Sequence, residues 1–190
     1  MKNYELEEEL RLSGLNVFTP KDVARLTLKP INYVYLMLHK NKRLVRIEKG
    51  LYCLQGTDPM VIASYLMTPS YISLISAFSY YKLIDQVPRT IKVVTGKRHA
   101  PLDIIGTRIE FRSVKKGMLY GYKREHNIAI ADIEKAIVDS LYLLEDTQYL
   151  EEVISNASAS GSFDAGKLIS YAKKSGKHIV YERAKLLVEK

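Results

Sequence analysis

The feature that most constrains the fold is an alternating segment, LVRIEKGLYCL at residues 44–54, which follows a series of short helical patterns. Its two apolar stretches flank Lys49 and Gly50, and glycine readily adopts the left-handed backbone that a tight turn needs. We therefore predict a β-hairpin over 44–54. Apolar residues at helical spacing predict helices before it, over residues 4–14, 19–27 and 29–41.

Local signals mark where these helices begin and end. Thr19 suits an N-cap and Pro20 the first helical position, whereas Asn41 is predicted to end the third helix in a left-handed conformation. One side of the third helix carries apolar residues at i, i+3, i+4 and i+7. We predict that this side faces the core through Ile31, Val34, Tyr35 and Leu38.

Three short helices followed by a hairpin are typical of a winged helix-turn-helix, which we predict for residues 1–56. In that module the third helix enters the DNA major groove and the hairpin is the wing. Between Lys29 and Lys49 the chain has six Lys/Arg and one acid, Glu48. The predicted DNA-binding residues lie outside the apolar stripe of the third helix or along the hairpin: Lys29, Asn32, Tyr33, Met37, Lys40, Lys42, Arg43, Arg46 and Lys49.

The same pattern leaves a second function open. Winged helices also act as protein-docking adaptors, and exposed Tyr33 and Met37 would suit a protein partner as well as DNA. The alternatives to sequence-specific DNA binding are therefore an adaptor without an operator, and an RNA-binding or nucleotide-handling enzyme built on the C-terminal domain.

Residues 57–190 are predicted to form a mixed helix and sheet domain, so that the whole chain belongs to the α+β class. Alternation at a period of two predicts strands over 90–95 and 107–114. Residues 96–106 and 115–127 are predicted to be loops. Helices are predicted over 58–69, 70–83, 131–146, 147–157, 164–176 and 178–189.

The formal net charge of +8 is concentrated in two segments. Residues 1–49 have ten Lys/Arg against six Asp/Glu, and residues 88–124 have ten against two. We predict a second surface in 88–124 that binds DNA, RNA or an acidic protein, with Tyr120 and Tyr122 available for stacking on bases. The alternative is a basic face that is only solvated. The residues of this surface are Arg89, Lys97, Arg98, Arg112, Lys115, Lys116, Lys123 and Arg124.

Signals for catalysis are weak, and we predict no enzyme activity, no catalytic residue, no metal and no cofactor. The turn Gly161-Ser162 lacks the pair of acids that a nucleotidyltransferase would place about ten residues later. Asp132 and Glu134 are explained by the dipole at a helix N-terminus. The four histidines share no ligand spacing, and Cys53, the single cysteine, is predicted to be a buried inert thiol.

The location of the protein is also predicted from the sequence. No apolar run approaches the length of about 20 residues that a transmembrane helix needs. The N-terminus is acidic, unlike a targeting peptide, and one cysteine cannot form an internal disulfide. We therefore predict a cytoplasmic protein without a membrane partner.

Three segments together resemble the AbiEi family: KGLYCL at 49–54, YISLISAFSYYKLIDQVPRTIKVVTGKR at 71–98, and IADIEKAIVDSLYLLED at 130–146. Members are the antitoxins of bicistronic type IV toxin-antitoxin pairs linked to abortive phage infection. The resemblance covers about residues 17–190. It implies a winged-helix repressor that binds double-stranded operator DNA upstream of its own operon, and a C-terminal antitoxin domain. It also implies a nucleotidyltransferase-like toxin as functional partner, countered without a stable complex.

Overall fold

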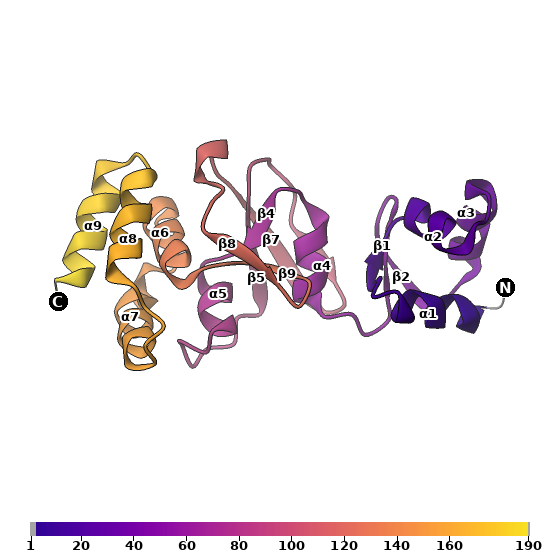
Figure 1. The fold of residues 1–190 in the computed structure, drawn as a ribbon, viewed down its shortest axis with the longest axis horizontal. Helices are drawn as coiled ribbons and strands as arrows, with labels where there is room; N and C mark the ends of the chain where they lie inside the picture. The colour runs from indigo at the N-terminus through magenta and orange to yellow at the C-terminus, as the bar shows by residue number, and fades with distance from the viewer. Residues whose placement is uncertain (1–2, 190) are drawn as a thin grey trace. The chain divides into compact units, whose positions relative to one another are not determined.

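The computed structural model describes residues 3–189, and the chain divides into two compact units, Met1–Tyr65 and Leu66–Lys190. Each unit combines helices with its own β-sheet (Figure 1). The α+β class predicted from the sequence is therefore confirmed. The helix α4 (Pro59–Leu66) contains the point in the sequence at which one unit gives way to the other.

Within the described residues, the N-terminal unit begins with three helices and a small antiparallel sheet. The predicted hairpin is confirmed, because β2 and β3 pair antiparallel and Gly50 between them has the left-handed φ of +79°. A two-residue strand, too short to show an alternating pattern, pairs with β3 and gives the sheet order β1-β3-β2. The elements are α1 (Asn3–Leu12), β1 (Val17–Phe18), α2 (Pro20–Thr27), α3 (Ile31–Lys40), β2 (Leu44–Glu48) and β3 (Leu51–Leu54).

The core of this unit lies between the helices and β3. It is built from Leu6, Leu10, Phe18, Val23, Val34, Leu38 and Leu54. Of the four α3 residues predicted to face the core, Val34 and Leu38 therefore do so and the other two do not. Ile31 and Tyr35 are exposed, and Met37 packs against the core instead, because the buried stripe of α3 is narrow and centred on Val34 and Leu38.

The cap predicted for α2 is confirmed. The Thr19 hydroxyl accepts a hydrogen bond from the Asp22 backbone N–H at 3.3 Å, and the Asp22 carboxylate accepts one from the Thr19 N–H at 2.8 Å. This reciprocal pair satisfies donors that the first turn would otherwise leave unpaired. The prediction for Asn41 is wrong, since its backbone is extended, at φ −85° and ψ 99°, and its side chain accepts from the Arg43 N–H instead.

Removing this cap is expected to weaken the N-terminal unit measurably. We expect Thr19→Ala to lower the free energy of unfolding by about 1 kcal/mol, since the Asp22 N–H loses its acceptor. Urea unfolding followed by circular dichroism measures the change. Thr19→Ser, which keeps the hydroxyl, is the matched control and should stay close to the unmodified protein; equal losses in both variants would contradict the capping role.

The C-terminal unit is built on a mixed six-stranded sheet in the order β6-β7-β5-β4-β9-β8. Strand β5 runs parallel to β7, and β4 runs parallel to β9, whereas the remaining neighbours are antiparallel. The strands are β4 (Ser70–Ile72), β5 (Thr90–Thr95), β6 (Leu102–Ile104), β7 (Thr107–Ser113), β8 (Tyr122–Glu125) and β9 (Ile128–Ala131).

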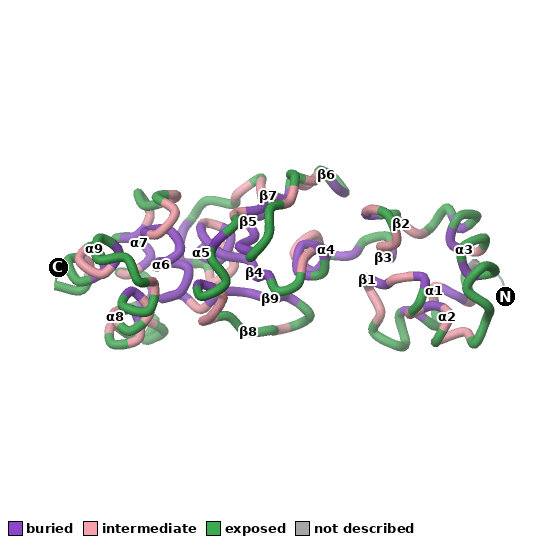
Figure 2. The backbone as a smooth tube through the Cα atoms, turned by 90° about the horizontal axis from the view of Figure 1, so that it is seen from above, coloured by how far each residue is buried: buried purple, intermediate pink, exposed green. Residues whose placement is uncertain are grey.

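Helices α6, α8 and α9 pack against one another, and α5 packs on both α6 and β5. Figure 2 shows most of α6 as buried, and each residue from Ile133 to Leu141 is buried. The other helical segments are a short 3-10 turn, Lys116–Met118, and another, Thr147–Tyr149. The α-helices are α5 (Ile75–Tyr80), α6 (Ile133–Leu143), α7 (Leu150–Ala159), α8 (Ala165–Lys174) and α9 (His178–Val188).

Four strands of this unit were not predicted. Residues 70–72 form the buried strand β4 and not the start of a helix, because a short apolar strand buried on both faces has no alternating pattern to distinguish it. The same holds for β9, which is buried throughout. Strands β6 and β8 lie at the two edges of the sheet, within segments predicted to be loops.

Candidate nucleic-acid interface

The outward side of α3 is exposed and largely uncharged. Val34 and Leu38 hold the helix on the core, so the side chains on its opposite face project into solvent. Leu36 is 60% exposed, Tyr35 52% and Tyr33 44%. Tyr35 and Leu36 line one groove, whereas Tyr33 does not contribute to it. Large apolar side chains that are exposed next to each other are typical of a contact surface.

A groove of about 610 Å³ lies between this face of α3 and the β2–β3 hairpin. We call it the α3–hairpin groove. The helix contributes residues spaced by one turn, and the hairpin contributes two cations and an aromatic ring. The lining residues are Asn32, Tyr35, Leu36, His39, Arg46, Lys49, Gly50 and Tyr52.

The hairpin side of the groove is held in place by local contacts. The Tyr52 ring stacks on the core residue Phe18 with 6.4 Å between ring centroids. Cys53, the next residue, is fully buried, and burial raises the pKa of its thiol to about 11. Arg46 stays exposed, and its guanidinium donates to the Glu48 backbone carbonyl at 3.4 Å across the bulge in β2.

Most of the residues predicted to bind DNA are exposed on the N-terminal unit. Three of them, Asn32, Arg46 and Lys49, line the α3–hairpin groove. Met37 is the exception, because it is half-buried against the core and is not available to a ligand. The exposed residues are Lys29, Asn32, Tyr33, Lys40, Lys42, Arg43, Arg46 and Lys49.

Five groove residues were not among the predicted ones: Tyr35, Leu36, His39, Gly50 and Tyr52. Tyr35 was assigned to the core by its spacing. The sequence contained a signal for Leu36 and His39, because Leu36 is at i+4 and His39 at i+7 from Asn32, and these positions lie on the same side of a helix. Tyr52 could not be assigned from sequence, because an alternating strand does not reveal which of its faces borders a groove.

The predicted second surface in residues 88–124 is partly neutralised within the C-terminal unit. Arg112 pairs with Glu110 at 3.0 Å and also with Glu145, and Lys123 pairs with Glu125 at 2.7 Å. The pair with Glu145 joins residues far apart in the sequence, whereas the other two pairs each join two residues of one strand. Arg112 and Lys123 therefore have intramolecular counter-ions that the charge count along the chain did not reveal.

Four other cations of this set come together as a group, which we call the basic cluster. Strands β5 and β7 are parallel and in register, and the Val114 N–H donates to the Thr95 carbonyl at 2.9 Å where both strands end. The residues that follow the two strands are consequently neighbours. All are exposed and have no counter-ion among the described residues: Lys97, Arg98, Lys115 and Lys116.

The remaining two members of the predicted second surface lie elsewhere. Arg89 precedes β5 and is therefore at the opposite end of that strand from the basic cluster. Arg124 is on the edge strand β8, where its guanidinium donates to the Asn127 carbonyl at 3.2 Å. The structure thus brings together half of the residues that were predicted to form one surface.

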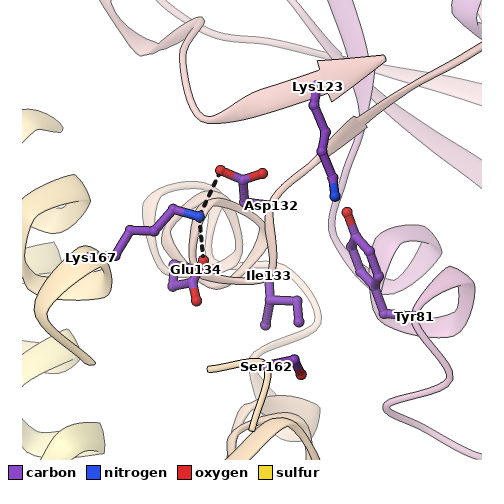
Figure 3. A pocket seen from close by; sticks show the side chains of 7 residues that line it. All are labelled: Tyr81, Lys123, Asp132, Ile133, Glu134, Ser162 and Lys167. Carbon is purple, nitrogen blue, oxygen red and sulfur yellow. Dashed lines mark ion pairs between the residues drawn. The ribbon is translucent and has the colours of Figure 1, made fainter. Parts of the chain in front are cut away.

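A polar pocket of about 310 Å³ lies at the start of α6 (Figure 3). Lys167 of α8 bridges Asp132 at 2.9 Å and Glu134 at 3.1 Å. Burial alone would lower the pKa of Lys167, but its bonds to the two carboxylates outweigh burial and raise the pKa to about 12. Lys167 therefore remains charged at neutral pH and ties α8 to the N-terminus of α6.

The two carboxylates in this pocket have further structural partners. The Tyr171 hydroxyl donates to Asp132 at 3.1 Å, and the Asp164 backbone N–H donates to Glu134 at 2.9 Å. The dipole explanation given for these acids is thus incomplete, because both also bind α8 or the residue that caps it. Across residues 3–189, no group of three or more His, Cys, Asp or Glu side chains is arranged to hold a metal ion.

Breaking the Lys167 bridge is expected to destabilise the C-terminal unit. We expect Lys167→Met to lower the free energy of unfolding by about 1–2 kcal/mol, since Glu134 is nearly fully buried and loses its cation. Urea unfolding measures the loss. Lys173→Met, on the exposed side of the same helix, is the control and should change stability by less than about 0.5 kcal/mol; equal effects would show that the bridge contributes nothing.

Comparison with known proteins identifies a structure with a similar fold but does not assign the chain to a family. No protein-family model and no curated protein matches the chain. Among solved structures, the crystal structure of Rv2827c protein from Mycobacterium tuberculosis is similar, with a TM-score of 0.61 and 14% sequence identity over 96% of this chain and 74% of that chain. At this identity the likeness shows a shared fold alone.

Among residues 3–189, none of the helices combines the length and the apolar character that crossing a bilayer requires.

Proposed function

We propose that the protein is a sequence-specific DNA-binding repressor of its own operon and the antitoxin of a type IV toxin-antitoxin pair. The observation that carries the DNA-binding part is the α3–hairpin groove, in which the exposed cations Arg46 and Lys49 of the hairpin face the uncharged side of α3. In this proposal residues 1–56 are a winged helix-turn-helix, with α3 as the recognition helix and the β2–β3 hairpin as the wing. Residues 57–190 are the antitoxin domain.

Charge placement supports DNA as the ligand. Lys29 precedes α3, Lys40 ends it, and Lys42 and Arg43 follow it, while Arg46 and Lys49 belong to the hairpin. Phosphates on either side of a major groove are contacted by cations placed at the ends of a recognition helix and on its flanking wing. The uncharged face between these cations is left to contact the bases.

The antitoxin part rests on the resemblance of residues 49–54, 71–98 and 130–146 to the AbiEi family. The partner it implies is a nucleotidyltransferase-like toxin encoded beside this gene. Co-expression of the full chain with the product of the neighbouring gene tests it. Rescue of growth supports the antitoxin role, and continued arrest with both proteins present contradicts it.

Binding to DNA from immediately upstream of the reading frame tests the repressor role. The full-length protein is titrated against labelled upstream DNA and against a scrambled duplex across about 50 to 200 mM salt, since phosphate contacts weaken steeply over this range. Retention of upstream DNA alone at the higher salt supports a specific repressor. Equal binding to both duplexes that disappears with salt contradicts it.

The adaptor alternative is favoured by one observation, the exposure of Tyr33, Tyr35 and Leu36 on α3. A protein partner would cover this apolar area, whereas DNA would cover both it and the surrounding cations. Charge reversal on the hairpin separates the two, because an adaptor that needs only the apolar face would keep its partner.

A further inference from the structure

The outward face of α3 lacks the side chains that read G·C base pairs most strongly. Guanine is typically read in the major groove by Arg or Lys, and cytosine by Glu or Asp. Residues 31–39 contain none of these four residue types. The α3 positions that line the groove are instead Asn32, Tyr35, Leu36 and His39.

Two of these residues have the chemistry that reads A·T base pairs. An asparagine side chain can form two hydrogen bonds with adenine: its amide oxygen accepts one from the N6 amino group, and its amide N–H donates one to N7. An apolar side chain packs against the methyl group that only thymine presents. Asn32 supplies the amide, and Leu36, 60% exposed, supplies the apolar group.

The spacing of the two side chains suits neighbouring base pairs. Asn32 and Leu36 are four residues apart, so they lie on the same side of α3 and are separated by about 6 Å along its axis. Base pairs in B-DNA are stacked about 3.4 Å apart. A recognition helix lying along the major groove would therefore place these side chains within one or two base-pair steps of each other.

The cations around this face decide the kind of partner. Lys29 precedes α3 and Lys40 is its last residue, while Arg46 and Lys49 line the hairpin side of the groove, so cations lie at both ends of the helix and opposite its uncharged face. A purely apolar protein partner would leave this charge without a complement. Duplex DNA complements both parts, because phosphates border a major groove whose floor carries thymine methyl groups.

We infer that α3 reads A·T base pairs, with Asn32 contacting adenine and Leu36 contacting a thymine methyl within one or two base-pair steps. This inference rests on the proposed DNA-binding function and deepens it by assigning the bases and the residues that read them. The phosphate contacts of Lys29, Lys40, Arg46 and Lys49 then supply affinity without sequence preference.

Base analogues in the upstream DNA test the assignment one atom group at a time. Replacing thymine by uracil removes only the methyl group, and replacing adenine by 7-deazaadenine removes only the N7 acceptor. Full-length protein, Leu36→Ala and Asn32→Ala are each titrated against duplexes carrying one replacement at a time. Both positions are exposed, so thermal unfolding should show that each variant remains folded.

We expect each base replacement to lower the affinity of the unmodified protein, but not the affinity of the variant that lacks the side chain contacting that base. At one or two positions, uracil should weaken the unmodified protein several-fold and leave Leu36→Ala unaffected. At a neighbouring adenine, 7-deazaadenine should weaken it by about 5-fold or more, at the low end of the discrimination of a bidentate contact, and leave Asn32→Ala unaffected. The control Lys40→Ala should bind all the duplexes more weakly by one common factor.

The failures of the inference and of the proposed function are distinguishable. If upstream DNA is preferred over scrambled DNA but every analogue binds normally, or if Leu36→Ala and Asn32→Ala retain the analogue penalties, the A·T assignment is overturned and the repressor stands. If upstream and scrambled duplexes bind alike, or if single-stranded RNA is preferred to both, the proposed function fails and the assignment fails with it.

Discussion

Replacing both Arg46 and Lys49 by glutamate is expected to weaken binding of the upstream DNA by at least about 60-fold at 0.1 M salt. Each phosphate contact multiplies affinity by the salt concentration to the power of about −0.9, so two lost contacts account for this factor before any repulsion is added. Both side chains are exposed and line the α3–hairpin groove, which leaves the core unaffected. Titration of labelled upstream DNA from about 50 to 200 mM salt measures it.

The salt dependence distinguishes a phosphate contact from a folding defect. The plot of log affinity against log salt should become shallower by about 1.8, since each contact contributes about 0.9 to its slope. Lys173→Glu with Lys185→Glu in the C-terminal unit changes the net charge equally at exposed positions and should leave the slope unchanged. A uniform weakening in both double variants would mean that overall charge, and not the hairpin, determines binding.

Much of the N-terminal unit could be predicted from sequence because its signals are local. The Thr19 cap, the turn at Gly50 and the order of helices and hairpin each depend on residues a few positions apart. The errors arose where tertiary contacts decide the outcome. Tyr35 was predicted to face the core but is exposed, and Met37 was predicted to be exposed but packs on the core. Helical spacing predicts that a buried stripe exists, but it does not determine the width or the centre of that stripe.

The C-terminal unit was harder because its sheet is assembled from distant segments. Strand β4 pairs with β5 on one side and with β9, nearly sixty residues later in the chain, on the other. A short strand buried in this way has the same apolar pattern as a buried helix segment. The edge strands β6 and β8 depend on pairing partners that no local pattern identifies.

The candidate site shows the same division between local and distant information. The charge count singled out residues 1–49 and 88–124, but it could not separate paired from unpaired cations. Arg112 is paired with Glu145 of a segment more than thirty residues away, whereas Lys97 and Lys115 come together because β5 and β7 are parallel. Only the strand register reveals which charges are available to a partner.

Replacing Asp139 by alanine is expected to lower the free energy of unfolding of the C-terminal unit by about 3–5 kcal/mol, because it leaves a buried lysine without its counter-ion. Asp139 and Lys135 form an ion pair on α6, and both side chains are fully inaccessible to solvent. Ser73 also donates to Asp139 at 2.8 Å. Burial raises the pKa of Asp139 and lowers that of Lys135, while the attraction between the two opposes both shifts.

The pair itself need not stabilise the fold, and a double replacement separates the two effects. Lys135→Met with Asp139→Leu removes both charges at similar volume, so we expect it to be far more stable than Asp139→Ala. Urea unfolding, with hydrogen exchange of the 133–143 peptide as a probe confined to this unit, measures both variants. Asp85→Ala, at an exposed position, should change stability by less than about 0.5 kcal/mol. Two outcomes would contradict this explanation: a loss of stability in Asp139→Ala as small as that in Asp85→Ala, or a loss in the double variant as large as that in Asp139→Ala. In either case the unpaired charge of Lys135 would not be the cause.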